Sequence, residues 1–163
     1  MANPDTAFIY TDASYSKAHD LAVIGFAGFA GVDQHRLTPL SELELHFEVI
    51  SEKNNIRSEV RAAIMGLKSC PKHSNVVLYS DCHAVTKLPQ RREKLERQKF
   101  ISQSSGLVLN NADLYQRFYL ISDELNLEIH WVKGHSPNKN LDQVQQNFAY
   151  LDKQVRNKLR SSL

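Results

Sequence analysis

The sequence predicts an α/β fold built on a five-stranded mixed sheet, and three observations support this prediction. Three strand-like segments follow one another within the first 50 residues, an order that favours an antiparallel meander. After residue 57, helical and strand-like segments alternate, which favours parallel strands joined by crossover helices. The 163 residues contain 42% hydrophobic side chains and show no linker or internal repeat, so we expect a single domain over residues 1–163.

The three opening strands differ in pattern. Residues 7–11 form a short apolar run that ends at Asp12, and residues 21–30 are apolar and rich in Val, Ile and Phe. Over residues 42–50 apolar and polar side chains alternate as far as Val49, which is the period of a strand with one buried face. Together these segments account for the predicted antiparallel part of the sheet.

The remaining elements alternate between the two periods. Apolar side chains recur every three or four residues in the helical segments and form short continuous runs in the strands. In chain order we predict a helix over residues 58–68, a strand over 75–80, a short helix from 83 that stops near Pro89, a helix over 111–125, a strand over 127–132 and a helix over 141–159.

Composition excludes several classes of protein. The longest apolar stretch, residues 21–32, is shorter than the roughly 20 residues that a membrane helix needs, so we expect no membrane association. The N-terminus lacks the pattern of a signal peptide, and Cys70 and Cys82 show no metal-ligand spacing. We therefore expect reduced thiols and a cytoplasmic protein. A net charge of +2 is too small to indicate nucleic-acid binding by itself.

Three carboxylates stand where they could meet. Asp12 and Asp81 end two strands in near-identical settings, Ile-Tyr-Thr-Asp and Leu-Tyr-Ser-Asp, and Glu59 opens the helix after the third strand. Functional groups gather beyond the carboxyl ends of strands in α/β sheets, and close carboxylates repel unless a cation lies between them. Three carboxylates without a Cys/His cluster favour Mg²⁺ or Mn²⁺ over zinc. Taken singly, each residue could instead cap a helix or interact with its dipole.

His135 lies in a loop after the last strand, within Trp131-Val132-Lys133-Gly134-His135-Ser136-Pro137. A loop histidine beside a carboxylate cluster suits proton transfer. An isolated loop histidine is also commonly an ordinary surface residue, so the sequence leaves both interpretations open.

Five motifs together resemble ribonuclease H of the bacterial HI type. They are Tyr10-Thr11-Asp12-Ala13-Ser14, Arg57-Ser58-Glu59 with Ala62-Ala63-Ile64, Ser80-Asp81, Asn111-Ala112-Asp113-Leu114-Tyr115-Gln116-Arg117 and Trp131-Val132-Lys133-Gly134-His135, in the family's order over residues 8–148. The resemblance implies a metal-dependent endonuclease that hydrolyses the RNA strand of RNA–DNA hybrids and leaves 5′-phosphate products. It also implies two Mg²⁺ ions per site, with Mn²⁺ as an alternative. We expect a monomer, although the sequence does not fix the oligomeric state.

The resemblance implies four acidic metal ligands. Asp12, Glu59 and Asp81 match the first three, and Asp142 within Asn138-Lys139-Asn140-Leu141-Asp142-Gln143-Val144 matches the fourth. Asp152 is the competitor. It lies ten residues further along, roughly 15 Å in a helix, so we expect it to be too far from the strand ends unless the helix begins late. His135 is expected to assist proton movement or product release.

Substrate contacts are also implied by the resemblance. Asn55 first, and Asn54 second, are expected to read the 2′-hydroxyl in the minor groove, although each could instead bond its own backbone. The segment over residues 87–99 occupies the place of a basic protrusion that grips the hybrid, although it could be a solvated helix; its expected phosphate contacts are Arg91, Arg92, Lys94 and Lys99. The family pattern is broken at Ala13, Cys82 and His83, where Gly, Ser and Gln are usual.

Two other classes of function stay open. One is a non-catalytic hybrid-binding domain of the same fold, which gains weight if neither Asp142 nor Asp152 reaches the site. The other is a DNA-processing nuclease, because resolvases and integrases share the superfold. The start at Met1 favours a free enzyme over a piece of a retroelement or polyprotein.

Overall fold

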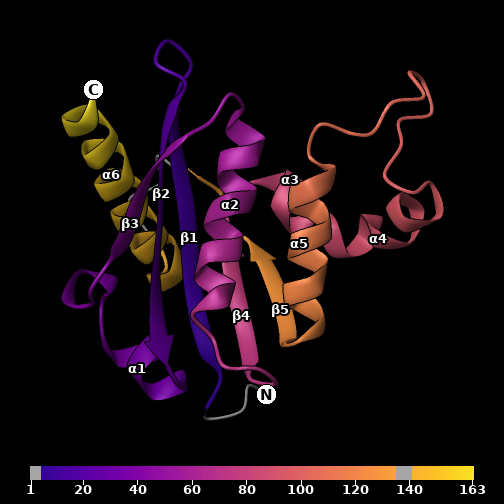
Figure 1. Cartoon of the computed structure of the whole chain (residues 1–163). Coiled ribbons are helices and arrows are strands. Elements are labelled where there is room, and N and C mark those ends of the chain that lie inside the picture. Colours follow the sequence, from indigo (N-terminus) through magenta and orange to yellow (C-terminus); the bar gives the residue numbers. More distant parts are fainter. Residues whose placement is uncertain (1–4, 135–140) are drawn as a thin grey trace.

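The computed structural model describes residues 5–134 and 141–163. These residues form a five-stranded sheet in the order β3-β2-β1-β4-β5 (Figure 1). The strands are β1 (Ala7–Ser16), β2 (Leu21–Ala30), β3 (His46–Ser51), β4 (Asn75–Ser80) and β5 (Asn126–Trp131). β1, β2 and β3 pair antiparallel, whereas β4 runs parallel to β1 and β5 parallel to β4. The predicted mixed sheet is confirmed.

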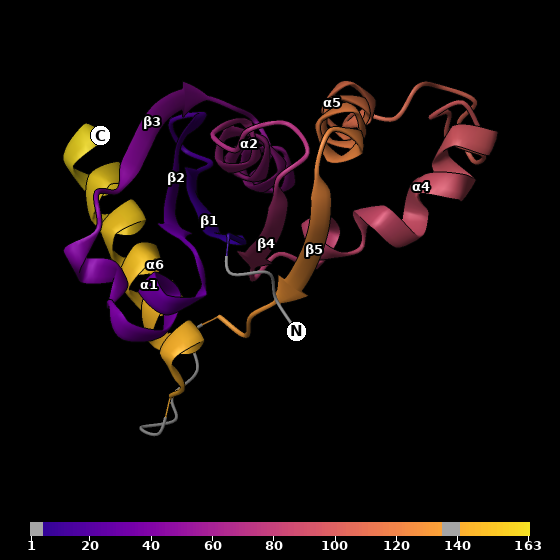
Figure 2. The same ribbon diagram turned by 90° about the horizontal axis from the view of Figure 1, so that it is seen from below.

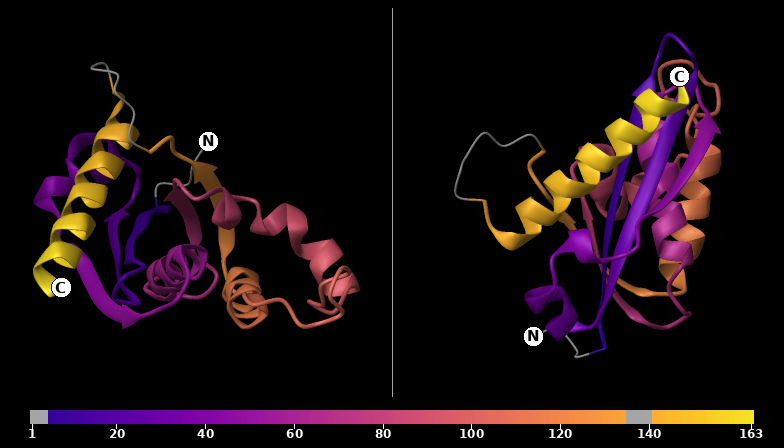
Figure 3. Two further views of the ribbon diagram at one scale, coloured as in Figure 1. Left: turned by 90° about the horizontal axis from the view of Figure 1, so that it is seen from above. Right: turned by 90° about the vertical axis from the view of Figure 1, so that its left-hand side faces the viewer.

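Helices cover both faces of the sheet (Figure 2). α2 (Asn55–Lys68) and α5 (Ala112–Asp123) lie on one face, and α6 (Gln143–Ser162) lies on the other. Seen from the side, α6 crosses the sheet obliquely and ends near the turn between β1 and β2 (Figure 3). α3 (His83–Thr86) and α4 (Leu88–Arg97) follow β4, and α4 projects beyond the sheet at β5.

β1 is longer than predicted, and this corrects the expected position of Asp12. The strand does not end at Asp12 but continues to Ser16, because β2 supplies a ladder partner along the whole strand, with Asp12 opposite Gly25. β4 pairs with β1 only as far as Tyr10, which lies opposite Tyr79. Asp12 and Asp81 each follow one of these tyrosines by two residues, so they still reach the same level of the sheet.

The structure differs from the predicted elements in three places: one strand begins later than predicted, and two helices were missed. The predicted strand over 42–50 begins only at His46, because residues 40–42 form a short 3₁₀ turn, η1 (Leu40–Glu42). α1 (Val32–Leu37) was not predicted, since six residues are too few to establish a helical period. The predicted short helix from residue 83 is α3, which ends at Thr86, but the helix that follows it, α4, was not predicted. Pro89 lies in the first turn of α4, where its missing N–H costs nothing.

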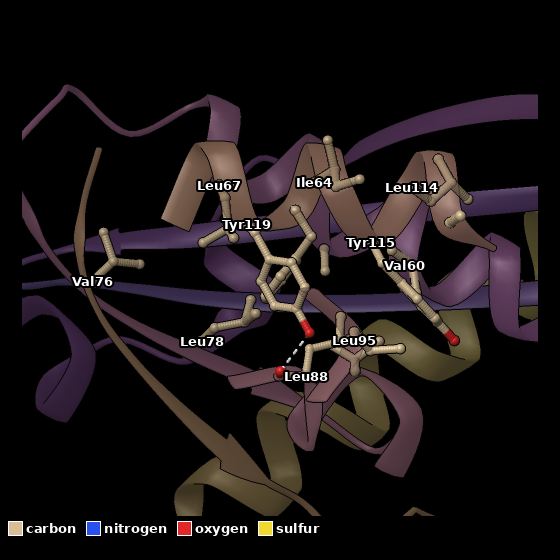
Figure 4. Close-up of a cluster of buried hydrophobic side chains, with 14 of the residues drawn as sticks. Val60, Ile64, Leu67, Val76, Leu78, Leu88, Leu95, Leu114, Tyr115 and Tyr119 are labelled. Atoms are coloured by element: carbon tan, nitrogen blue, oxygen red, sulfur yellow. Dashed lines mark hydrogen bonds between the residues drawn. The ribbon is translucent and has the colours of Figure 1, made fainter. Parts of the chain in front are cut away.

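Two apolar cores lock the layers together. Between the sheet and the α2/α5 layer, side chains such as Val60, Ile64, Leu78 and Tyr119 pack against one another (Figure 4). On the other face the buried side chains of α6, Phe148, Leu151 and Val155, pack against β1 and β2. Within the described residues, no helix is both long and apolar enough to cross a membrane.

Candidate active site

Three carboxylates meet at the carboxyl end of β4. Asp12 comes from β1, Glu59 from the second turn of α2, and Asp81 directly follows β4. One carboxylate oxygen from each residue lies within 4.8 Å of the others. The structure therefore brings together the three acids that the sequence singled out.

Local structure explains why Glu59 faces this cluster. Asn54 caps α2, because its side chain accepts the backbone N–H of Arg57 at 3.1 Å. The helix then packs against β1 so closely that a Cβ on Gly66 would lie 2.8 Å from a methyl of Thr11. This contact turns Glu59 toward the strand, where its carboxylate accepts the backbone N–H of Ala13.

The cluster concentrates negative charge in a buried place. Asp12 is 2% exposed and Glu59 is 6% exposed. Burial, followed by repulsion from Glu59, Asp81 and Asp152, raises the pKa of Asp12 well above its usual value. Burial, followed by repulsion from Asp81, raises the pKa of Glu59 in the same way, although the Ala13 N–H opposes this shift.

Two oxygens in the cluster are left unsatisfied. Asp12 Oδ2 and Glu59 Oε2 are buried and have no hydrogen-bond partner among the described residues. Buried acceptors without partners cost free energy, and buried carboxylates are normally paired or bound to metal. The donor set consists only of carboxylate oxygens, which suits a hard divalent cation. The residues present therefore fit a metal ion.

The structure contradicts the expectation that Asp152 is too far from the strand ends to join the cluster. Asp152, not Asp142, lies beside the cluster and hydrogen-bonds to Asp12. Asp142 is the N-cap of α6: its Oδ1 accepts the N–H of Gln145 at 2.8 Å, while its own N–H donates to Gln145 Oε1 at 3.0 Å. Such a capping box satisfies two helix-terminal donors, which gives Asp142 a structural role.

The reason for the error lies in how α6 meets the sheet. The start of α6 packs beside η1, where Asn147 Oδ1 accepts the Leu40 N–H at 3.1 Å, and Asn147 Nδ2 donates to the Tyr10 hydroxyl at 3.3 Å. Asn147 therefore stands level with Tyr10, and Asp152 stands level with Asp12, two residues further along β1. The sequence-based expectation assumed that the first turn of α6 lies level with Asp12, whereas a later turn of the helix does.

One signal for Asp152 was available in the sequence. It lies four residues after Phe148 and three before Val155, both of them in the apolar stripe of α6, and this spacing places its side chain on the helix face that packs against the sheet. Arg156, one turn later, forms an ion pair with Asp152 at 3.1 Å. A pocket of about 110 Å³ beside this pair is lined in part by Lys133, Asp152 and Arg156.

The expected substrate-contact residues divide into two groups. Asn54 is used as a helix cap and Arg92 as a clamp between helices, while Asn55, Arg91, Lys94 and Lys99 are exposed. Arg92 Nη2 donates to Asp123 of α5 at 2.8 Å, its Nε donates to Glu96 at 2.7 Å, and its guanidinium lies 5.0 Å from the centre of the Tyr119 ring. His135, together with Asn138 and Asn140 of the predicted pattern, lies outside the described residues.

The family assignment follows from comparison with known proteins. The RNase H family model matches residues 4–157. The chain belongs to the RNase H family. Among curated relatives, ribonuclease H of Idiomarina loihiensis is 27% identical over 146 residues, a match that covers 85% of this chain and 83% of the relative. Ribonuclease H of Legionella pneumophila (strain Corby) is 29% identical over 94 residues, which covers 58% of this chain and just under two thirds, 66%, of that protein.

Solved structures support the same fold. LC9-RNase H1, a type 1 RNase H with the type 2 active-site motif, superposes with a TM-score of 0.71 at 14% identity, over 100% of this chain and 76% of that chain. The protease–reverse transcriptase of prototype foamy virus superposes with a TM-score of 0.68 at 16% identity, over 96% of this chain but 21% of that chain. At these identities the likeness establishes the RNase H fold.

Proposed function

We propose that this RNase H family protein is an endoribonuclease that hydrolyses the RNA strand of RNA–DNA hybrids and leaves 5′-phosphate ends. The observation that carries the proposal is the buried carboxylate cluster with two unsatisfied oxygens, at the carboxyl end of β4 in an RNase H fold. The named function of the relatives agrees with it.

In this proposal Asp12, Glu59, Asp81 and Asp152 hold two divalent ions, Mg²⁺ or Mn²⁺. Bound at such a site, a pair of ions supplies an activated water and stabilises the leaving 3′-oxygen. Asp12 would take part in holding both ions, because Glu59, Asp81 and Asp152 all act on its charge. Glu59 and Asp81 would add ligands on one side of it and Asp152 on the other. Asp142, in its capping box, is not part of the set.

His135 keeps the role expected from the sequence, which is proton movement or product release. We expect that His135→Ala slows cleavage without abolishing it, because the carboxylates remain. Cytoplasmic location and a monomeric state also stay predictions.

Exposed polar and basic side chains support hybrid recognition. Asn55 opens α2, the helix that carries Glu59, so it is the candidate for contact with the RNA 2′-hydroxyl. Arg91, Lys94 and Lys99 are exposed on and just after α4, which projects past β5 (Figure 1). Phosphate neutralisation by such residues would make binding salt-dependent. Arg92 is excluded from this group, since its donors already hold Asp123 and Glu96.

The decisive experiment is cleavage of an end-labelled RNA–DNA hybrid with Mg²⁺, alongside single-stranded RNA, duplex RNA and duplex DNA. We expect cutting of the hybrid's RNA strand alone, and loss of cutting in EDTA, in Asp12→Asn and in Asp81→Asn. Salt-dependent binding without cleavage would instead favour a non-catalytic hybrid-binding domain. Cleavage of duplex DNA would favour a DNA-processing nuclease of the superfold.

Asp152→Asn and Asp142→Asn form a matched pair for the fourth acid. Asp152→Asn should lower the cleavage rate on the order of 100-fold or more, because a ligand charge is lost. Asp142→Asn should cleave at close to the wild-type rate and keep its stability, because Asn caps helices about as well as Asp. The reverse result would restore Asp142 as the ligand.

A further inference from the structure

The segment from Trp131 to Gly134, at the end of β5, holds Asp81 from two sides. The indole Nε1–H of Trp131 donates to the backbone carbonyl of Asp81 at 3.1 Å. A Cβ built on Gly134 would lie 2.5 Å from Asp81 Oδ2. We propose that Trp131 and Gly134 are positioning residues that set the place of the Asp81 carboxylate and thereby the metal affinity of the site. This inference rests on the proposed function.

On the Trp131 side, the backbone around Asp81 is fixed by several contacts. Ser80 lies opposite Trp131 in the β4–β5 ladder, and the Val132 N–H donates to the Ser80 carbonyl at 2.9 Å. The indole also stacks on the His83 ring, with ring centres 4.6 Å apart and planes inclined by 15°. Ser80 and His83, on either side of Asp81 in the chain, therefore both contact the segment at Trp131.

On the Gly134 side, the requirement is for space. The backbone of Gly134 is not in the left-handed region, so alanine could adopt its conformation. The added methyl would also lie 3.4 Å from both Cβ and Cγ of Asp81, and the closest atom is a terminal oxygen of the side chain rather than backbone. Gly134→Ala should therefore leave the fold intact and displace the Asp81 carboxylate.

Of the three clustered carboxylates, Asp81 most needs such support. Asp12 and Glu59 are buried by the packing of α2 against β1, whereas Asp81 is partly exposed and follows the end of its strand. Mutual repulsion favours movement of the most exposed carboxylate toward water. Residues that orient a metal ligand typically affect metal affinity by 10- to 100-fold when they are changed.

Trp131 is the single tryptophan of the chain, so its fluorescence reports directly on this contact. We expect Mg²⁺ to change the Trp131 emission of the wild-type protein in a saturable way. The reason is that the ion would bind the carboxylate of Asp81, whose backbone carbonyl accepts the indole N–H. The change should be lost in Asp12→Asn, in which Trp131 and its hydrogen bond remain but the metal site is damaged.

Metal affinity is then measured without any cleavage assay, from the rise in Tm with Mg²⁺ concentration. Trp131→Phe retains a ring that can stack on His83 but removes the N–H, and we expect Mg²⁺ affinity about 10-fold weaker. For Gly134→Ala we expect a loss between about 10- and 100-fold. Tyr119→Phe is the matched control, because it also removes one side-chain donor to a backbone carbonyl, that of Leu88 at 2.6 Å (Figure 4), in the core between α4 and α5. Tyr119→Phe should lower Tm by the same amount in EDTA and in Mg²⁺, so its Mg²⁺ affinity should equal that of the wild-type protein.

Wild-type Mg²⁺ affinity in both Trp131→Phe and Gly134→Ala, with affinity lost in Asp81→Asn, would overturn the positioning roles and leave the proposed function standing. Absence of any Mg²⁺- or Mn²⁺-dependent stabilisation in the wild-type protein would overturn both. Equal weakening in Tyr119→Phe would show that general destabilisation explains the effect, and would also overturn the inference.

Discussion

Two buried glutamates at the same end of α2 have pKa values that are shifted in opposite directions. Glu52, just after β3, is 8% exposed, and Glu59, in α2, is 6% exposed. Burial alone would raise the pKa of both carboxyls, yet the pKa of Glu52 is lowered and that of Glu59 is raised well above its usual value. At Glu59, burial is the largest cause of the raised pKa and repulsion from Asp81 adds to it. At Glu52, hydrogen bonds and the charges of its arginine partners outweigh burial and lower the pKa.

Glu52 is fully provided with donors by the protein itself. Its Oε1 accepts from the Lys53 N–H at 2.9 Å and from Arg57 Nε at 3.2 Å, and its Oε2 accepts from Arg61 Nη1 at 3.2 Å. Arg57 extends the network to α5, where Nη1 and Nη2 donate to Asp113 at 2.8 and 3.1 Å. This carboxylate holds β3, α2 and α5 together.

Glu59 is repelled by two neighbouring carboxylates, Asp81 and Asp152, and itself forms no ion pair within the described part of the chain. Arg156 pairs with Asp152 instead. The structural carboxylate of Glu52 is neutralised by the protein's own arginines, whereas we expect the candidate catalytic carboxylate of Glu59 to be neutralised by a metal ion. Such stored repulsion is expected where function outweighs stability. The same substitution at both positions should then have opposite effects.

The largest expected effect is the loss of stability in Glu52→Gln. The amide removes the charge that Arg57 and Arg61 share, and its NH₂ becomes a donor that faces one of these arginines. We expect the free energy of unfolding to fall by about 2 kcal/mol, less than for a fully buried pair because both arginines are partly exposed. Urea unfolding measures this, and an unchanged midpoint would remove the structural role. Below the unfolding transition, Mg²⁺ should still stabilise this variant.

Glu59→Gln should have a smaller effect of opposite sign in EDTA. The neutral amide relieves repulsion from Asp81, and its NH₂ can donate to a neighbouring carboxylate. We expect the free energy of unfolding to rise by about 1 kcal/mol, while hybrid cleavage and Mg²⁺-dependent stabilisation are lost. A less stable variant in EDTA would mean that Glu59 is a structural residue like Glu52.

The sequence predicted which three carboxylates meet in the cluster, but it did not predict the contacts that depend on how distant elements pack. Convergence of Asp12, Glu59 and Asp81 could be predicted, because parallel strands align their ends and a helix start lies nearby. The Asp152 position could not, since the level at which α6 crosses β1 depends on the packing of Asn147 against η1 and Tyr10. Similarly, the two motifs that carry Arg57 and Asp113 were recognised only by resemblance, and the ion pair that joins them at 2.8 Å could not be predicted from either motif.

Charge counts along the chain also could not separate functional from structural cations. Arg92 has the same basic neighbours as Arg91 and Lys94, and it was expected to contact phosphate. In the structure Asp123, more than thirty residues away, takes its guanidinium. Ion pairs between distant segments are set by tertiary packing, so α4 can offer fewer free cations than its sequence suggests.

The smallest expected effect is a pH dependence that separates the two kinds of carboxylate in one protein. Asp12 and Glu59 have pKa values above their ordinary values of 3.8 and 4.5, so the folded state binds more protons than the unfolded state as pH rises above 4.5. Their contribution to stability in EDTA therefore falls with rising pH, until each raised pKa is passed. Glu52 and Asp113 have lowered pKa values, so their contribution is lost only as pH falls below about 4.

We expect wild-type stability in EDTA to decline on the order of 0.5 kcal/mol per pH unit above pH 5, equivalent to about a third of a proton. The decline should be weaker in Glu59→Gln and unchanged in a Glu52→Gln protein measured alongside it. Saturating Mg²⁺ should reverse the slope, because metal ligation needs deprotonated carboxylates and the ion then competes with protons for the same oxygens. The free energy of unfolding in EDTA could instead be independent of pH, or Mg²⁺ could leave its pH dependence unchanged. Either result would contradict the idea that the ion relieves repulsion within the cluster.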